Sequence, residues 1–173
     1  SEYPGIRVSI EAILDKTRQV MKVDITAGDK ITPQAVEYSF RLLFENRSIN
    51  ILAYNLETVL AEKLETILSR STANTRMRDY YDVYILTKLR TQNINWSIFF
   101  QAFKNTAEKR GSYSHLLKTG DDIIEKIERS QVLADLWSRY QQKNSYADDL
   151  TWRQVIESVK MLYIKAFDIA NNV

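Results

Sequence analysis

The spacing of hydrophobic residues changes once along the chain, from alternate positions in the first third to helical spacing in the rest. Residues 6–14 alternate between apolar and polar side chains, which is the pattern of a half-buried strand. The same alternation recurs over residues 19–26, 36–44 and 48–54. Because the connections between these segments are short, we predict a small sheet whose strands are mostly antiparallel.

The stretch from Tyr54 to Leu89 predicts two helices joined by a polar loop. Asn55 is a suitable N-cap for the first helix, whose apolar residues recur every three or four positions and mark one buried face. Two helices with a short connection tend to pack antiparallel, so we expect the second to run back along the first.

Helical spacing of apolar residues also governs the remainder of the chain. A helix begins near Trp96 and ends at Gly111, because glycine commonly terminates helices. We expect Asp121 or Asp122 to cap the next helix, which breaks near Ser130.

The last helix opens with Thr151 and Gln154, which have the spacing of a capping box. The single histidine, His115, is expected in a loop without partners and is interpreted as incidental. The elements together predict an α+β fold, in which a small, mostly antiparallel sheet is followed by a helical bundle. We place the sheet portion at residues 1–55 and the helical domain at residues 56–173.

Composition narrows the possible chemistry. The chain has 173 residues, of which 45% are hydrophobic and 27% charged, as is usual for a globular protein with a real core. The net charge of +2 is too small to indicate binding to nucleic acid or membrane by itself. Without cysteine, no disulfide or thiolate metal site can form, which leaves oxygen ligands and favours hard cations such as Mg²⁺. No apolar run spans a bilayer and no signal peptide is visible, so we expect a cytoplasmic protein without a membrane partner.

One lysine stands out within the apolar face of the first predicted helix. Lys63 lies one turn from both Val59 and Ile67, and an ammonium directed at a core is costly unless an anion receives it. Asp79 and Asp82 are three positions apart, so they share one side of the second helix. Antiparallel packing of the two helices would bring Lys63 close to this acidic pair.

Two arginines extend this cluster. Arg76 and Arg78 stand just before the acids, and cations with acids around one crevice suit phosphate chemistry. Two other interpretations remain open at this point. Lys63 can extend its ammonium to solvent along an apolar face, and Arg78 with Asp82 can be a simple helical ion pair.

Three segments together resemble the AbiEii/AbiGii toxin family, whose members are nucleotidyltransferase-like proteins of the polymerase-β superfamily. They are MKVDI at residues 21–25, AYNLETVLAEKLETIL at 53–68 and RMRDYYDVYIL at 76–86. The resemblance is clearest over residues 6–89, and it implies that the predicted sheet is the remainder of a nucleotidyltransferase fold.

The resemblance implies roles for the same charged residues. Asp24 matches a carboxylate that helps to hold Mg²⁺, and Lys63 matches a lysine that contacts the nucleoside triphosphate (NTP). Asp79 and Asp82 match acids that orient Lys63 or a water, or take part in proton transfer. Arg78 then either holds phosphate or locks the helix through Asp82.

The family also has a Gly-Ser turn followed by an Asp-x-Asp pair, which this sequence lacks. We therefore expect that the chain is the C-terminal part of a longer toxin and does not transfer nucleotides by itself. In the intact protein, the resemblance implies metal-dependent transfer of a nucleotide from an NTP to an acceptor, either RNA or protein.

Family membership would place the protein in a bacterial toxin–antitoxin system that acts in phage defence by abortive infection, with a cognate antitoxin that acts separately. The alternative is a non-catalytic interaction module derived from a degenerate nucleotidyltransferase.

Overall fold

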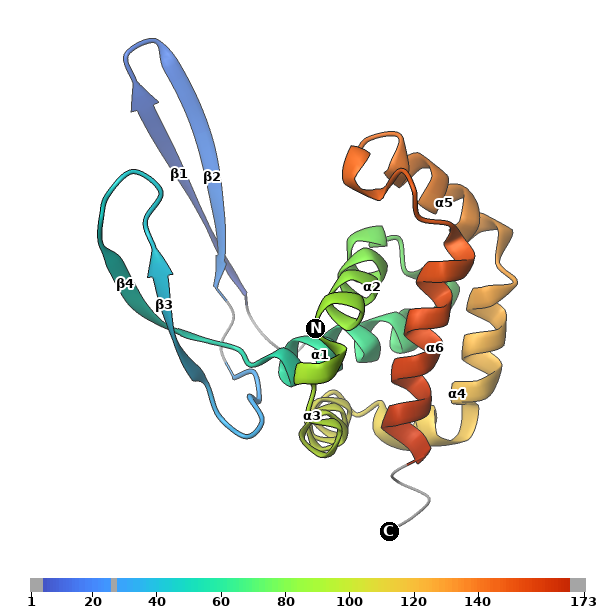
Figure 1. The fold of residues 1–173 in the computed structure, drawn as a ribbon. Helices are drawn as coiled ribbons and strands as arrows, with labels where there is room; N and C mark the ends of the chain where they lie inside the picture. The colour runs from blue at the N-terminus through green and yellow to red at the C-terminus, as the bar shows by residue number, and fades with distance from the viewer. Residues whose placement is uncertain (1–4, 26–27, 169–173) are drawn as a thin grey trace. The chain divides into compact units, whose positions relative to one another are not determined.

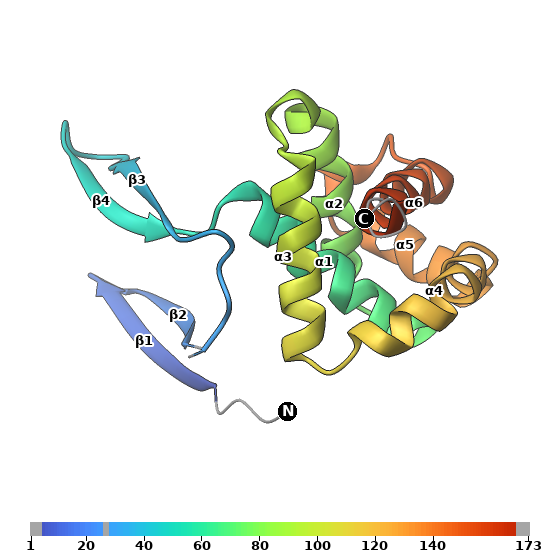
Figure 2. The ribbon, with the colours of Figure 1, turned by 90° about the horizontal axis from the view of Figure 1, so that it is seen from below.

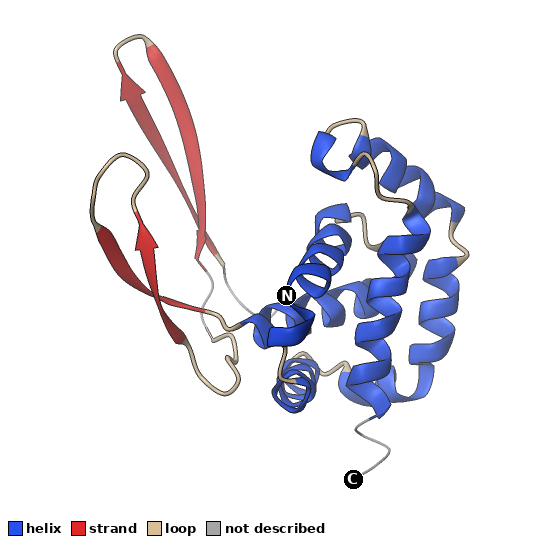
Figure 3. Ribbon diagram, viewed as in Figure 1, coloured by secondary structure: helices blue, strands red, loops and turns tan. Residues whose placement is uncertain are grey.

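The computed structural model describes residues 5–25 and 28–168 and confirms the α+β class. In the described part of the chain, four strands precede six α-helices (Figure 3). The chain divides into two compact units, Ser1–Lys30 and Ile31–Val173. The first unit contains one hairpin, and the second contains another hairpin together with all of the helices.

The hairpin of the first unit consists of two antiparallel strands, β1 (Ile6–Leu14) and β2 (Thr17–Ile25), with Ile6 opposite Ile25. Its register gathers apolar side chains on one face, because residues two apart in a strand point the same way. That face is exposed and comprises Ile6, Val8, Ile10, Met21, Val23 and Ile25. Thr26, the last residue expected in the second strand, lies outside the described residues.

The second hairpin pairs β3 (Val36–Arg41) with β4 (Ser48–Ala53), also antiparallel. The prediction that the third strand continues to residue 44 is wrong, because the chain turns after β3. The backbone N–H of Leu42 donates to the carbonyl of Arg47 at 3.1 Å, which closes the loop. The predicted antiparallel pairing is confirmed, although the strands form two separate hairpins and not one sheet.

The second hairpin also has an exposed apolar face. Its exposed members are Val36, Tyr38, Phe40, Ile49 and Ile51. Thr32, which precedes this hairpin, is fastened to the helices through hydrogen bonds. Its carbonyl accepts from the Asn55 amide at 2.6 Å, and its hydroxyl accepts from the Asn105 amide at 2.9 Å.

The helices pack around one hydrophobic core whose fully buried large side chains include Leu64, Tyr80, Phe103 and Trp137. In Figures 1 and 2, α6 lies alongside α2 and α4, while α3 lies against α1, and these pairs are in contact. The helices are α1 (Leu56–Arg70), α2 (Met77–Arg90), α3 (Trp96–Lys109), α4 (Tyr113–Glu128), α5 (Gln131–Gln141) and α6 (Trp152–Asp168). No described helix has the length and apolar character needed to cross a membrane.

The predicted helix ends are largely confirmed. The side chain of Asn55 caps α1 by accepting from the backbone N–H of Thr58 at 3.0 Å. Gly111 has a φ of 69° two positions after the end of α3, a conformation that glycine adopts without strain. Thr151 and Gln154 form the reciprocal bonds of a capping box at the start of α6.

The predicted start of α4 is wrong. The helix begins at Tyr113, so Asp121 and Asp122 lie in its middle, and His115 lies in the helix and not in a loop. The prediction rested on aspartate being a favoured N-cap residue type, and here both aspartates lie within a helix. Gly120, next to them, lies at a close contact with α6: a Cβ atom at this position would lie 2.6 Å from the hydroxyl of Tyr163, so a larger residue would displace that side chain.

Candidate functional site

Lys63 on α1 forms ion pairs with two aspartates on α2, so the three residues make one charged cluster. The ammonium of Lys63 lies 3.1 Å from Asp79 Oδ1 and 2.8 Å from Asp82 Oδ2. The three side chains retain only 21%, 16% and 19% of their exposure, respectively, so solvent screens the pair weakly. The spacing of the acids along α2 places both on the side that faces α1, as the sequence predicts.

This environment keeps Lys63 charged. Burial by itself lowers the pKa of the Lys63 ammonium, but the hydrogen bonds that it donates to Asp82 and Asp79 outweigh burial and raise its pKa above the ordinary value. A lysine ammonium has three N–H donors, and the aspartates use two of them. One donor therefore remains for a ligand.

Lys63 and Asp79 also line a small polar pocket of about 260 Å³. The pocket lies within the helical unit and carries three cations and two acids. Its lining residues are Tyr54, Val59, Glu62, Lys63, Thr66, Arg76, Asp79 and Arg110. Asp82 and Glu65, which lie outside the lining, pair with Lys63 and Arg110, so Arg76 is the lining cation that is left to attract an anionic ligand.

The two arginines of the pocket are held in different ways. The guanidinium of Arg110 is fixed by ion pairs with Glu65, which is only 3% exposed, and with Glu62 at 3.6 Å. Hydroxyl groups of Ser69 and Ser112 also donate to Glu65, at 2.6 and 2.7 Å.

Arg76 contrasts with Arg110, because its guanidinium is exposed and makes no ion pair or hydrogen bond to another residue in the described ranges. It precedes α2, where the free backbone N–H groups of a helix start add positive potential. Arg76 is therefore the pocket cation most available to a ligand.

Arg78 lies outside this pocket, on the far side of Asp82. Its Nε donates to Asp82 Oδ1 at 2.7 Å, so Asp82 bridges Arg78 and Lys63. The guanidinium also donates to the Tyr146 hydroxyl at 3.2 Å and lies over the ring of Tyr81, 5.8 Å from its centre. The hydrogen bond and charge of Asp82 raise the pKa of Arg78, which stays fully charged.

Asp24 lies on β2 of the first unit, where both of its oxygens bind the guanidinium of Arg7, at 2.5 and 2.9 Å. Both side chains are exposed, and the hydrogen bond from Arg7 lowers the pKa of Asp24. The carboxylate is therefore ionised at neutral pH. Its convergence with Lys63, Asp79 and Asp82 stays a prediction.

A family model described as nucleotidyl transferase AbiEii toxin, type IV toxin–antitoxin system, matches residues 1–160. The chain belongs to this family. No curated protein and no solved structure gives a significant match to the chain. Membership assigns a role in toxin–antitoxin nucleotidyl transfer, and it agrees with the resemblance of the segments around Asp24, Lys63 and Asp82.

Nucleotidyl transfer generally relies on divalent metal ions bound by clustered carboxylates. In the described parts of this AbiEii chain, no three histidine or acidic side chains come together as metal ligands. Asp24 is engaged by Arg7, and Asp79 and Asp82 are engaged by Lys63. These residues do not fit a complete magnesium site by themselves.

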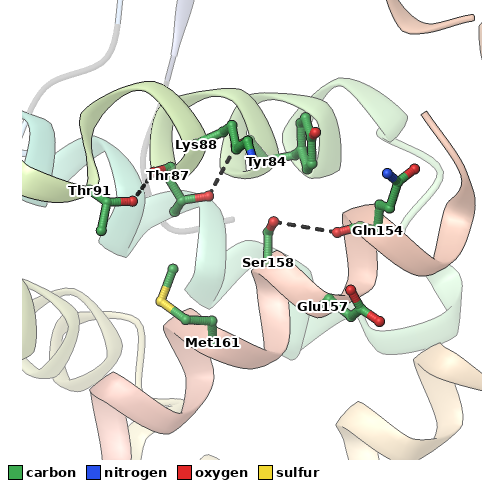
Figure 4. A pocket seen from close by; sticks show the side chains of 8 residues that line it. All are labelled: Tyr84, Thr87, Lys88, Thr91, Gln154, Glu157, Ser158 and Met161. Atoms are coloured by element: carbon green, nitrogen blue, oxygen red, sulfur yellow. Dashed lines mark hydrogen bonds between the residues drawn. The ribbon is translucent and has the colours of Figure 1, made fainter. Parts of the chain in front are cut away.

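A second hollow, of about 380 Å³, lies between α2 and α6 (Figure 4). Two of its hydroxyl groups are used within their own helices: Thr87 donates to the carbonyl of Val83 at 2.7 Å, and Ser158 donates to that of Gln154 at 3.4 Å. Its lining has one cation, Lys88, against three in the pocket at Lys63, so this hollow is a weaker candidate for the family's nucleotide.

Sequence reasoning missed several residues around Lys63. It did not identify Glu62, Thr66 or Arg110 as pocket residues, or Tyr146 as a partner of Arg78. Arg110 is separated from Glu65 by 45 positions, and Tyr146 from Arg78 by 68. No local spacing carries a signal for contacts of this range.

Proposed function

We propose that the pocket at Lys63 binds the phosphates of an NTP during nucleotidyl transfer by this AbiEii-family toxin. One observation carries the proposal: the ammonium of Lys63 is held between two carboxylates at the edge of a pocket that also contains Arg76 and Arg110. Such a site presents oriented positive charge to an anion without a large reorganisation on binding.

The proposed division of roles follows from these contacts. Negative charge builds on the phosphate oxygens during transfer, and Lys63 with Arg76 stabilises that charge. Asp79 and Asp82 keep Lys63 protonated and oriented. Arg78 acts through Asp82 and keeps this carboxylate in place, and it is not the main phosphate ligand.

The remaining parts of the reaction are proposed from the family. By the resemblance, Asp24 would supply one ligand to a Mg²⁺ ion. The acceptor is a hydroxyl group of RNA or of a protein. We place the reaction in the bacterial cytoplasm, within a phage-defence system whose antitoxin acts separately.

A non-catalytic interaction module is the second candidate function. The observation that favours it is the exposed apolar face of each hairpin, with side chains such as Ile10 and Phe40 about 45% and 44% accessible. Exposed apolar surface of this kind commonly marks a site of association. On this reading, the ion pair of Lys63 serves only to join α1 to α2.

Replacement of Lys63 distinguishes the two functions. For Lys63→Ala introduced into the intact toxin and expressed in cells from an inducible promoter, we expect loss of growth inhibition while the purified variant keeps its helical circular dichroism. Transfer of labelled nucleotide to cellular RNA or protein should fall together with toxicity. Lys118→Ala, at an exposed position on α4, serves as the matched control.

The opposite result would favour the interaction module. In that case, Lys63→Ala would remain toxic at the level of Lys118→Ala, and no labelled acceptor would be lost. A folded variant is required for either conclusion, so the circular dichroism and thermal unfolding of both proteins are measured in parallel.

A further inference from the structure

We propose that Tyr146 is a positioning residue for Lys63, and that it acts through Arg78 and Asp82. This inference rests on the proposed function of the pocket for its biological meaning, but its geometry can be tested without it. The segment that carries Tyr146 lies between α5 and α6, far in sequence from both α1 and α2.

The first part of the network is the carboxylate of Asp82, which bonds to two cations at once. Oδ2 receives Lys63 at 2.8 Å and Oδ1 receives Arg78 at 2.7 Å. A rotation of this carboxylate that improves one contact weakens the other, so a fixed Arg78 fixes the oxygen that faces Lys63.

The second part is the clamp on Arg78. The side chain is 64% exposed, and an exposed arginine–carboxylate pair alone is weak and mobile. Here the guanidinium donates to the Tyr146 hydroxyl at 3.2 Å and lies 5.8 Å from the ring centres of both Tyr81 and Tyr146. The centroids of the two rings are 4.8 Å apart and their planes are inclined by 56°, so both rings lie within cation–π distance of the guanidinium.

The third part holds Tyr146 itself. Its hydroxyl lies 2.8 Å from the hydroxyl of Tyr140 and donates to Asn144 Oδ1 at 3.0 Å. The amide of Asn144 donates to the carbonyl of Tyr140 at 2.7 Å, which closes a small ring of contacts. Burial raises the pKa of the Tyr140 phenol, which therefore stays protonated and able to donate.

The segment is in turn anchored to the helical core. The indole N–H of Trp137, which is 1% exposed, donates to the carbonyl of Leu150 at 2.8 Å. The amide of Gln141 donates to the carbonyl of Ala147 at 2.9 Å. The helical core therefore holds Tyr146 in place. Contacts between Tyr146, Arg78 and Asp82 connect this core to Lys63.

The test measures how firmly the ammonium of Lys63 is held, by following proton exchange of its ¹⁵N-labelled NH₃⁺ group with water by NMR. Loss of one bond in the network should speed this exchange roughly two- to tenfold. We expect the larger change for Tyr146→Ala, which removes both ring and hydroxyl, and the smaller change for Tyr146→Phe. Tyr113→Phe, on α4 and outside the network, is the control and should leave exchange unchanged.

A double-mutant cycle separates positioning from general loosening. If Tyr146 acts through Arg78, Tyr146→Phe has no further effect on Lys63 exchange in an Arg78→Ala background. Additive effects, or unchanged exchange in folded Tyr146→Phe and Tyr146→Ala, would overturn the proposal. Should Tyr146→Ala not fold, Tyr146→Phe alone decides, since it keeps the ring contacts.

Nucleotide binding by the same variants keeps the two proposals apart. Faster Lys63 exchange in a chain that binds no NTP would support the positioning network and contradict the proposed function. Unchanged Lys63 exchange in variants of a chain that binds NTP would contradict the positioning network and support the proposed function.

Discussion

At the scale of single residues, the structure decides between two interpretations of Lys63 that its spacing leaves open. A lysine that merely extends along an apolar face would end in water, whereas this one ends between Asp79 and Asp82. The period of α1 and the three-residue spacing of the acids made this contact one of the outcomes expected from the sequence. The sequence did not indicate that Arg78 would be drawn to Tyr146, because that contact depends on the path of a distant loop.

The raised pKa of Lys63 predicts a specific dependence of stability on alkaline pH. The folded-state pKa lies above the ordinary value of 10.5, so the ion pair contributes fully below that pH and is lost as pH rises through the folded-state pKa. At neutral pH, Lys63→Met should lower the free energy of unfolding by about 1–3 kcal/mol, because two carboxylates lose their cation. This difference from wild type should shrink above about pH 10.5 in urea unfolding curves. A difference in the free energy of unfolding that stays constant up to pH 12 would contradict a stabilising role of the charged Lys63 ammonium.

At the scale of elements, local sequence signals predicted most helix ends. Contacts between helices instead depend on residues that are far apart in the sequence. The caps at Asn55 and Thr151 follow from residue type and spacing alone. The start of α4 was mispredicted because Asp121 and Asp122 are suitable N-cap residues by type, although both lie within the helix. The joint formed by Glu65 and Arg110 links α1 to the end of α3 and left no pattern in the sequence.

Glu65→Ala should therefore destabilise the helical unit strongly. The substitution leaves Arg110, Ser69 and Ser112 without their shared acceptor, and we expect a loss of about 2–4 kcal/mol. Glu157→Ala is the control, because its pair with Arg153 is exposed and should contribute less than about 0.5 kcal/mol. Chemical unfolding followed by circular dichroism measures both. Equal effects of the two substitutions would show that the joint at Glu65 is not a main support.

At the scale of the whole molecule, the helices and the hairpins differ in how they are stabilised. The helices share one core, whereas the strand side chains are almost all exposed within their own units. An isolated two-stranded hairpin is marginally stable in water. The alternation of apolar and polar residues correctly predicted the strands. It did not predict which apolar faces are buried, because the sequence pattern is the same for a buried face and an exposed one.

Amide hydrogen exchange should reveal this division directly. We expect amides of β1–β2 and β3–β4 to exchange within roughly minutes and those at the centres of α1 and α3 to persist for roughly hours, because core helices open only with global unfolding. Protection of the hairpins equal to that of α1 would mean that their apolar faces are covered in solution, for example by association of chains. Repeating the measurement at two protein concentrations distinguishes that case.

The central claim is that the pocket at Lys63 binds a polyphosphate, and calorimetric titration of the chain with an NTP tests it most directly. Lys63→Ala and Arg76→Ala should each raise the Kd about tenfold or more, because each removes a charge-assisted hydrogen bond. Lys118→Ala should bind like the wild type. Equal affinity in all four proteins, or no saturable binding in the wild type, would contradict the account.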